Sequence, residues 1–147
     1  MLDVKVRTLL AVAAEGSFTR AANTLSLTQP AVSHQIAQLE KELGCTLFRR
    51  KDGKLSLTEE GEIALNCAKR MQALEEKMQG EIQDSRRSLR RIRIGVTHTA
   101  ESNMVSEVLA KCAEKNHNLS ITMITDTIKN LYDMLENFEL DLAITEE

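Results

Sequence analysis

The chain has 147 residues, of which 42% are hydrophobic and 28% charged, and its formal net charge is −3. This length accommodates one domain, or one small domain with part of another. No apolar run approaches the ~20 residues that cross a bilayer, and the N-terminus lacks a secretory signal pattern, so we expect a cytoplasmic protein with no membrane partner. Three isolated cysteines, Cys45, Cys67 and Cys112, form neither a metal-ligand spacing nor a disulfide framework, so no metal or cofactor is expected.

The charge is unevenly distributed along the sequence. Residues 1–58 contain eight Lys/Arg and five Asp/Glu, a net of +3, whereas residues 89–147 contain six and ten, a net of −4. The overall negative charge argues against nucleic acid as a partner. A basic front end joined to an acidic rear end is nevertheless the asymmetry expected when only the front end meets a polyanion.

Three short helices are predicted in the first third of the chain. Apolar residues repeat at helical spacing over residues 2–15, and Gly16 is placed to end that helix. Ser17 is a suitable N-cap for a second helix over residues 18–25, and a short link leads from it to Thr28, the N-cap of the third. Two short helices joined by a tight turn are the plan of a helix-turn-helix unit.

The third helix, residues 28–43, has one apolar and one polar face. Val32, Ile36, Leu39 and Leu43 recur at spacings of four, three and four, and Pro30 occupies the first turn, where a missing N–H costs nothing. The opposite face is uncharged near its N-terminus and built from short side chains, a surface that can enter a DNA major groove. An ordinary amphipathic helix with a solvated side explains the same pattern, so the neighbouring elements must decide.

A basic hairpin is predicted directly after this helix. Residues 47–50 and 55–58 have the pattern of two short strands around Lys51-Asp52-Gly53-Lys54, and Asp-Gly between such runs is a strong hairpin signal. Such a hairpin beside a helix-turn-helix is a wing, whose positive charges can neutralise DNA phosphates. The alternative is a solvated hairpin whose charges serve solubility.

One uninterrupted helix is predicted for residues 59–88. Three glutamates lie in its first turns, where they interact favourably with the helix dipole. At 1.5 Å per residue it would be ~45 Å long, more than a small domain can cover. We therefore expect a homodimer through coiled-coil-like pairing, with docking on the chain's own rear domain as the alternative. The predicted dimerisation face comprises Ala64, Cys67, Met71, Leu74, Met78 and Ile82.

The rear part of the chain alternates between strand and helix patterns. A β-α-β-α-β order implies a parallel sheet with helical crossovers. Three strands and two helices leave much apolar surface uncovered, so we expect residues 89–147 to be the first part of a larger α/β domain. The predicted strands cover residues 91–96, 119–125 and 140–145, and the predicted helices cover residues 101–115 and 128–138.

Several sequence runs carry a more specific signal: SFTRAANTL, TQPAVSHQIAQLEKELG, LFRR and LTEEG. Together they resemble the DNA-binding end of LysR-type transcriptional regulators, and the resemblance continues into RIGVT and LDLAI. It implies a periplasmic-binding-protein-like domain that binds a small-molecule effector between two subdomains. The predicted fold is mainly α with an α/β part: a winged helix-turn-helix over residues 1–58, a linker and dimerisation helix over 59–88, and an incomplete effector-binding domain over 89–147.

The resemblance places four side chains of the third helix at base edges: Gln29, Pro30, Ser33 and His34. Their chemistry agrees, because Gln can bond adenine in a bidentate manner, Ser can bond several bases, and Pro can rest on a thymine methyl. For His34, a solvated histidine is the alternative. DNA phosphates are the predicted partners of polar side chains around the two helix N-termini and of the wing cations. These are Ser17, Thr19, Arg20, Thr28, Gln35, Arg50, Lys51 and Lys54.

Hydroxyl side chains after the first rear strand are predicted to contact the effector. Ligands of open α/β sheets bind at the carboxyl ends of strands, and the resemblance also places effector contacts there. The predicted residues are Thr97, Thr99 and Ser102, with Thr125 and Asp126 as weaker candidates and helix capping as the alternative for each hydroxyl.

The sequence therefore predicts a dimeric regulator, ligand-responsive in its complete form, that binds an inverted-repeat site in double-stranded DNA, with a tetramer as the larger alternative assembly. An enzyme is not expected, because the sequence contains no G-x-S-x-G, no phosphate-binding glycine loop and no Cys/His pair at useful spacing. A protein-interaction coiled coil centred on the long helix is the rival interpretation, and it predicts no salt-sensitive DNA binding.

Overall fold

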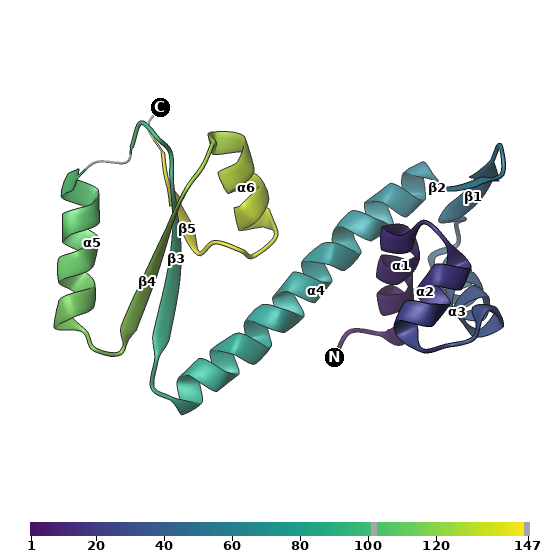
Figure 1. The fold of residues 1–147 in the computed structure, drawn as a ribbon, viewed down its shortest axis with the longest axis horizontal. Helices are drawn as coiled ribbons and strands as arrows, with labels where there is room; N and C mark the ends of the chain where they lie inside the picture. Colours follow the sequence, from purple (N-terminus) through teal and green to yellow (C-terminus); the bar gives the residue numbers. More distant parts are fainter. Residues whose placement is uncertain (101–102, 146–147) are drawn as a thin grey trace. The chain divides into compact units, whose positions relative to one another are not determined.

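The computed structural model describes residues 1–100 and 103–145, apart from the side chains of residues 51 and 103. The chain divides into two compact units, Met1–Gln72 and Ala73–Glu147. The first unit contains helices α1 (Val4–Glu15), α2 (Phe18–Leu25) and α3 (Gln29–Leu43), strands β1 (Phe48–Lys51) and β2 (Lys54–Leu57), and the first part of α4 (Glu59–Arg86) (Figure 1). The second contains the rest of α4 with β3 (Arg90–Val96), α5 (Asn103–Lys115), β4 (Leu119–Thr125), α6 (Ile128–Glu136) and β5 (Leu142–Ile144).

Caps define the ends of the first three helices, and the sequence predicts those at Ser17, Thr28 and Gly44. The Ser17 hydroxyl accepts from Arg20 N at 3.3 Å, and the Thr28 hydroxyl accepts from Ala31 N at 3.3 Å. Gly44 ends α3 with φ 69°, a left-handed conformation that glycine adopts without a Cβ clash. Helix α1 begins two residues later than predicted, because the Asp3 carboxylate accepts from Lys5 N and acts as the N-cap.

The three helices and the hairpin enclose one apolar core. Ala21 and Ala22 are 0% and 3% exposed, and their small side chains let α2 pack closely on its neighbours. Helix α4 contributes Ala68 to the same core. The remaining buried residues of this cluster are Leu9, Val12, Val32, Ile36, Leu39, Leu47 and Phe48.

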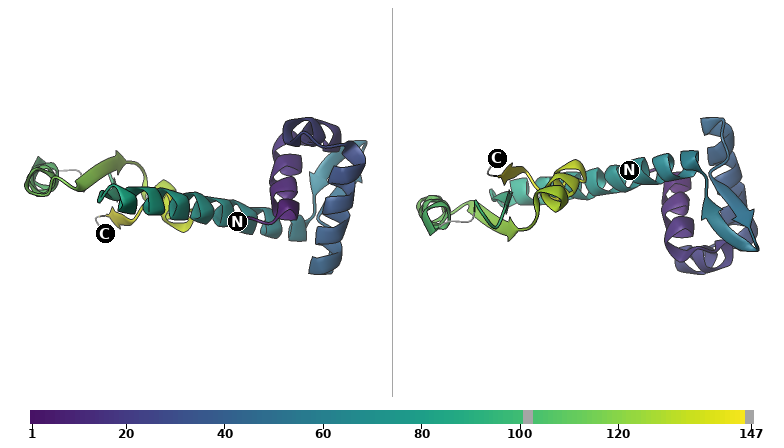
Figure 2. Two further views of the ribbon diagram at one scale, coloured as in Figure 1. Left: turned by 90° about the horizontal axis from the view of Figure 1, so that it is seen from below. Right: turned by 90° about the horizontal axis from the view of Figure 1, so that it is seen from above.

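The hairpin is tighter than the sequence suggests. Strands β1 and β2 are antiparallel, and Lys51 pairs with Lys54, so the turn contains only two residues. Asp52 and Gly53 have φ of 51° and 75°, and two successive positive φ angles are the geometry that favours Asp-Gly in a two-residue turn. The predicted four-residue connection is therefore wrong, and each strand is shifted by one residue toward the turn. Figure 2 shows the hairpin beside α3.

The second unit confirms the β-α-β-α-β order. Strand β3 lies between β4 and β5 and pairs with both in parallel. Leu109 of α5 packs with Ile94 and Val96 of β3. An added Cβ at Gly95 would instead meet Leu131 of α6 at 2.6 Å. Because successive side chains of a strand point to opposite faces, α5 and α6 cover opposite faces of the sheet, as Figure 1 shows.

Candidate nucleic-acid interface

Helix α3 separates its core contacts from its outer surface. Val32, Ile36 and Leu39 are between 0% and 7% exposed, whereas Leu43, the fourth residue of the predicted apolar face, is 53% exposed. Gln29, Pro30 and His34 are exposed, and Ser33 is half-buried at the edge of the same face. The side chains predicted to read bases therefore lie on the surface of the helix that solvent, or a DNA groove, can reach. Had they been packed into the core, the proposed reading of DNA would have been excluded.

Two of the predicted base-reading side chains are joined to each other. The Gln29 amide nitrogen donates to the Ser33 hydroxyl oxygen at 2.8 Å, across one turn of α3. This bond uses one of two Gln29 N–H donors and leaves the Ser33 hydroxyl proton for another acceptor. The pair thus offers a donor and an acceptor from the glutamine and a donor from the serine, in a fixed relative position.

Several predicted phosphate contacts already have partners within the first unit. Ser17 and Thr28 use their hydroxyl oxygens as helix caps. The Arg20 guanidinium donates through Nε to the Glu15 carbonyl at 3.1 Å and lies 3.8 Å from the Glu15 carboxylate. These three residues remain exposed or half-buried at the surface, as does Thr19. Their contact with phosphate stays a prediction.

Gln35 has a structural partner that the sequence did not indicate. The single hydroxyl proton of Thr8, which is fully buried in α1, is shared between the Gln35 amide oxygen and Val4 O, with Oγ1 3.0 Å from the latter. Gln35 is half-buried. Its oxygen therefore takes part in the packing of α1 against α3, and the bond does not use the amide N–H groups, which are the only donors that Gln35 could offer to a phosphate.

The wing presents positive charge from both of its strands. Arg49 and Arg50 on β1 and Lys54 on β2 are exposed. The side chain of Lys51 lies outside the described part of the structure. An exposed cluster of this kind is able to neutralise phosphates without reading the sequence of the bases.

Two residues that organise this region were not predicted. One is Glu40, whose carboxylate oxygen accepts from Leu47 N at 2.7 Å and Phe48 N at 3.3 Å. The other is Gly61, where an added Cβ would lie 2.1 Å from Leu47 O. Both lie in the sequence runs that resemble the family, Glu40 as the first E of QLEKELG and Gly61 as the G of LTEEG. That resemblance was the signal from which their importance could have been predicted.

The predicted dimerisation face of α4 is largely uncovered within the chain. Met71, Leu74, Met78 and Ile82 are each 47–49% exposed, and Cys67 is exposed too. Their spacing places them on one side of the helix. Ala64 differs, because it packs against the core of the first unit. Five of the six predicted residues thus form a continuous apolar strip, which we call the α4 stripe.

The predicted effector residues lie at the carboxyl ends of β3 and β4. Thr97 is 5% exposed, and its hydroxyl accepts from Ala100 N at 3.3 Å and lies 3.3 Å from the hydroxyl of exposed Thr99. The Asp126 carboxylate accepts from Thr127 N at 2.7 Å, the main cause of its lowered pKa, and from the Asn130 amide at 2.8 Å. Half-buried Thr125 pairs with Val96 across the two strands. Ser102 lies outside the described residues.

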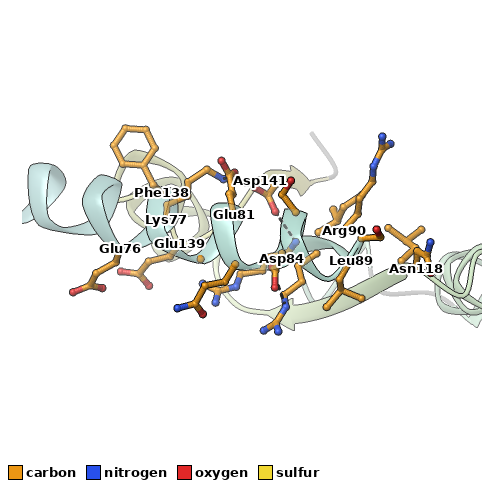
Figure 3. A pocket seen from close by; sticks show the side chains of 18 of the residues that line it. Glu76, Lys77, Glu81, Asp84, Leu89, Arg90, Asn118, Phe138, Glu139 and Asp141 are labelled. Atoms are coloured by element: carbon orange, nitrogen blue, oxygen red, sulfur yellow. Dashed lines mark hydrogen bonds and ion pairs between the residues drawn. The ribbon is translucent and has the colours of Figure 1, made fainter. Parts of the chain in front are cut away.

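An open, strongly charged groove lies at the opposite ends of these strands, within the second unit (Figure 3). The Lys77 ammonium of α4 donates to the Asp141 carboxylate at 2.8 Å, and Arg93 N donates to the other oxygen of the same carboxylate at 2.7 Å. Asp84 of α4 pairs with Arg91 of β3 at 3.1 Å. In this groove, hydrogen bonds and ion pairs hold α4 against the sheet. The groove does not include the predicted effector residues, which lie at the other ends of the strands.

The described residues contain no group of three or more His, Cys, Asp or Glu side chains placed to hold a metal ion. Within the same part of the chain, every helix is too short or too polar to cross a membrane.

Comparison with known proteins gives one consistent result. Residues 4–62 match the family described as bacterial regulatory helix-turn-helix protein, lysR family. A probable RuBisCO transcriptional regulator of Phaeodactylum tricornutum is 33% identical over 141 residues, which are 95% of this chain and 46% of that protein. The uncharacterized HTH-type transcriptional regulator YusT of Bacillus subtilis is 31% identical over 138 residues, 94% of this chain and 47% of that protein.

A solved structure agrees with these relatives. An OxyR cysteine mutant of Corynebacterium glutamicum has a TM-score of 0.59 at 28% identity, over 95% of this chain and 45% of that chain. The chain thus spans about half the length of the curated relatives it matches. The matches cover the helix-turn-helix, the long helix and the parallel sheet, and they are to regulators of transcription and not to enzymes. Residues 4–62 belong to the lysR family of bacterial regulatory helix-turn-helix proteins, and the chain as a whole is similar to regulators of transcription.

Proposed function

We propose that this chain binds double-stranded DNA sequence-specifically as a homodimer, with α3 of each copy in the major groove at one half of an inverted repeat. The observation that carries the proposal is the outer face of α3, where Gln29, Pro30 and His34 are exposed beside Ser33 while the opposite face is buried. Wing cations would neutralise phosphates next to the groove. Pairing of two α4 stripes would set the distance between the two recognition helices.

Ligand response is the second part of this proposal. Thr97 and Thr99 lie where open α/β sheets bind ligands, and a small-molecule effector would bind there in the complete protein. Its binding would tilt one dimer against another in a tetramer and so alter the bending of bound DNA. A cytoplasmic location remains a prediction from the sequence.

Binding experiments with two variants test the DNA part of the proposal. A duplex is first selected from a random-sequence pool by the unaltered chain, and affinity for it is compared with affinity for a scrambled duplex between about 50 and 200 mM salt. Gln29→Ala should lower the preference for the selected duplex by about 1–3 kcal/mol. Lys54→Ala should weaken binding to both duplexes about equally and reduce the salt slope by about 1.

Equal losses on both duplexes for Gln29→Ala would remove this residue from base reading. Absence of salt-sensitive binding by the unaltered chain would favour the rival interpretation, a coiled coil that binds only protein.

A further inference from the structure

A single side chain connects the recognition helix to the start of the wing. One Glu40 carboxylate oxygen accepts from the backbone N–H of Leu47 at 2.7 Å and of Phe48 at 3.3 Å. The backbone carbonyl of Glu40 accepts from Gly44 N and, at 3.1 Å, from Cys45 N. Four of the amide groups that lead from α3 into β1 therefore donate to one residue of α3.

The residues held by Glu40 are also where the hairpin is anchored. Leu47 is fully buried, and its carbonyl accepts from Thr58 N at 2.9 Å, immediately after β2. The ring of Phe48 packs edge-on against Phe18 at a centroid distance of 5.8 Å. The side chains of Leu47 and Phe48 thus fix the wing to the core, while Glu40 satisfies the N–H groups on the side of α3.

We propose that Glu40 is a positioning residue for DNA binding: it sets the wing against α3 so that the wing cations reach phosphates when α3 occupies the groove. This inference rests on the proposed DNA binding. Glu40 lies six residues beyond His34, about 9 Å further along the helix axis, so its role would not depend on touching bases. The cations whose position it controls are Arg49, Arg50 and Lys54.

The proposal separates two components of binding that usually change together. Without Glu40, two part-buried N–H groups lose their acceptor, and the side of the wing that faces α3 is no longer held in place. Phosphate contacts of the wing would weaken, while the base contacts of Gln29 and Ser33 would persist. Each lost phosphate contact lowers the slope of log affinity against log salt by about 0.9. A partly unfolded variant would behave differently, because a smaller active fraction lowers apparent affinity without changing that slope.

The test compares the full chain with Glu40→Ala on the selected and scrambled duplexes described above. We expect Glu40→Ala to have a salt slope smaller by about 1–3, one unit or so for each wing cation released. The ratio of the affinities for the two duplexes should stay within about twofold of that of the unaltered chain, a change below ~0.5 kcal/mol. Circular dichroism measures the folded fraction of each variant.

Three further variants act as controls. Glu40→Gln keeps an oxygen acceptor and should retain the full slope, although it removes the same charge. Glu42→Ala removes an equal charge from the same helix, where Glu42 pairs with Lys5 at 3.2 Å and not with the wing, and should also retain it. Glu40→Asp keeps the charge but shortens the side chain by one methylene, so it should lose slope. It replaces Glu40→Ala if that variant does not fold.

The outcomes are distinguishable from failure of the DNA-binding proposal itself. If the unaltered chain shows no salt-dependent binding, DNA binding fails and the role of Glu40 fails with it. If it binds and both Glu40→Ala and Glu40→Asp keep its slope, only the positioning role is overturned. Loss of slope in Glu40→Gln equal to that in Glu40→Ala would likewise overturn it, because an acceptor oxygen would then be insufficient.

Discussion

At the scale of single residues, the position of Gly61 shows how tightly the start of α4 meets the wing. Its missing side chain makes room for Leu47 O, which accepts from Thr58 N just before the helix begins. A Cβ at this position would lie 2.1 Å from that backbone oxygen, which no side-chain rotation can relieve. The glycine is therefore required by the close approach of two backbone segments.

Gly61→Ala should accordingly destabilise the first unit by about 2–3 kcal/mol, the cost of forcing extra volume into a packed site. Gly80→Ala is the matched control in the same helix, because an added Cβ there meets nothing within 4 Å. That substitution should stabilise the helix by about 0.5–1 kcal/mol, since glycine loses more backbone entropy on folding than alanine. Denaturant unfolding followed by circular dichroism measures both changes in stability. If the two substitutions changed stability equally and in the same direction, the account of Gly61 would be refuted.

Residue-level roles were predictable from the sequence only where they are local. Caps such as Ser17 and Thr28 act within three residues of themselves, so the spacing of polar residues around apolar runs was enough to place them. Gln35 is different, because its partner Thr8 lies 27 residues away on another helix. Glu40 was likewise missed, since nothing in the local spacing of residues indicates that its carboxylate accepts from backbone N–H groups at the start of β1, seven and eight residues further along the chain.

At the scale of elements, the junction between α4 and the sheet is held by charged contacts in the second unit. Burial of the Asp141 carboxylate acts to raise its pKa, but the Lys77 ammonium and the Arg93 N–H outweigh this and lower the pKa below 3.8. The same ion pair raises the pKa of Lys77 above 10.5. The backbone N–H of Asp141 also donates to Arg93 O at 2.9 Å, so the residue that directly precedes β5 is bonded to β3.

This junction gives the second unit a predictable dependence on pH. Because the folded pKa of Asp141 is lowered, its contribution is complete above the unfolded value of about 3.9 and is lost as the pH falls through the folded value. Lys77 contributes below 10.5 and loses its contribution only as the pH rises above that value. The contact should therefore persist from about pH 5 to pH 10.

Asp141→Asn should lower the stability of the second unit by about 1 kcal/mol at pH 7 and flatten its loss of stability in acid. Tyr132 of α6 is the single tyrosine and the chain has no tryptophan, so its fluorescence reports on this unit alone. Asp133→Asn, at an exposed position of α6, is the control for removing a carboxylate. The explanation fails if Asp141→Asn keeps the acid dependence of the unaltered chain.

Elements with strong periodicity were predicted well. The spacing of apolar residues placed α2 and β4 within their observed bounds, because one face of each packs on a core. Turn geometry limited the hairpin prediction, since a two-residue turn requires positive φ at Asp52 and Gly53 and draws Lys51 and Lys54 into the strands. Strand β5 covers Leu142–Ile144 and is shorter than the predicted strand over residues 140–145. Asp141 lies before it and accepts from Arg93 N of β3 through its side chain.

At the scale of the whole molecule, the α4 stripe is a row of apolar side chains that a single chain leaves half exposed. Four large apolar side chains on it are each about half exposed, at 47–49%. Recurrence at spacings of three and four is the pattern of a helix that packs against another helix. Our proposal of a homodimer follows from that exposure and not from the curated relatives, which are about twice as long as this chain.

Leu74→Glu tests the proposed dimer. Each copy would lose the burial of one leucine, about 1.5–3 kcal/mol, so the dimer Kd should rise at least about a hundredfold. Gln72→Glu introduces the same charge on a different side of α4 and should leave assembly unchanged. Sedimentation velocity over a range of concentrations measures the association, and identical behaviour of the two variants would place the dimer interface elsewhere.

The separation of faces on α3 has a consequence for how such a protein changes over generations. Stability depends on Val32, Ile36 and Leu39, whereas Gln29, Pro30 and His34 extend into solvent and contribute little to the core. If these outer side chains read bases as proposed, substitutions there would alter operator preference while the melting temperature stays nearly constant. A new promoter could be acquired through one or two such exchanges, and the rest of the scaffold would need no compensating change.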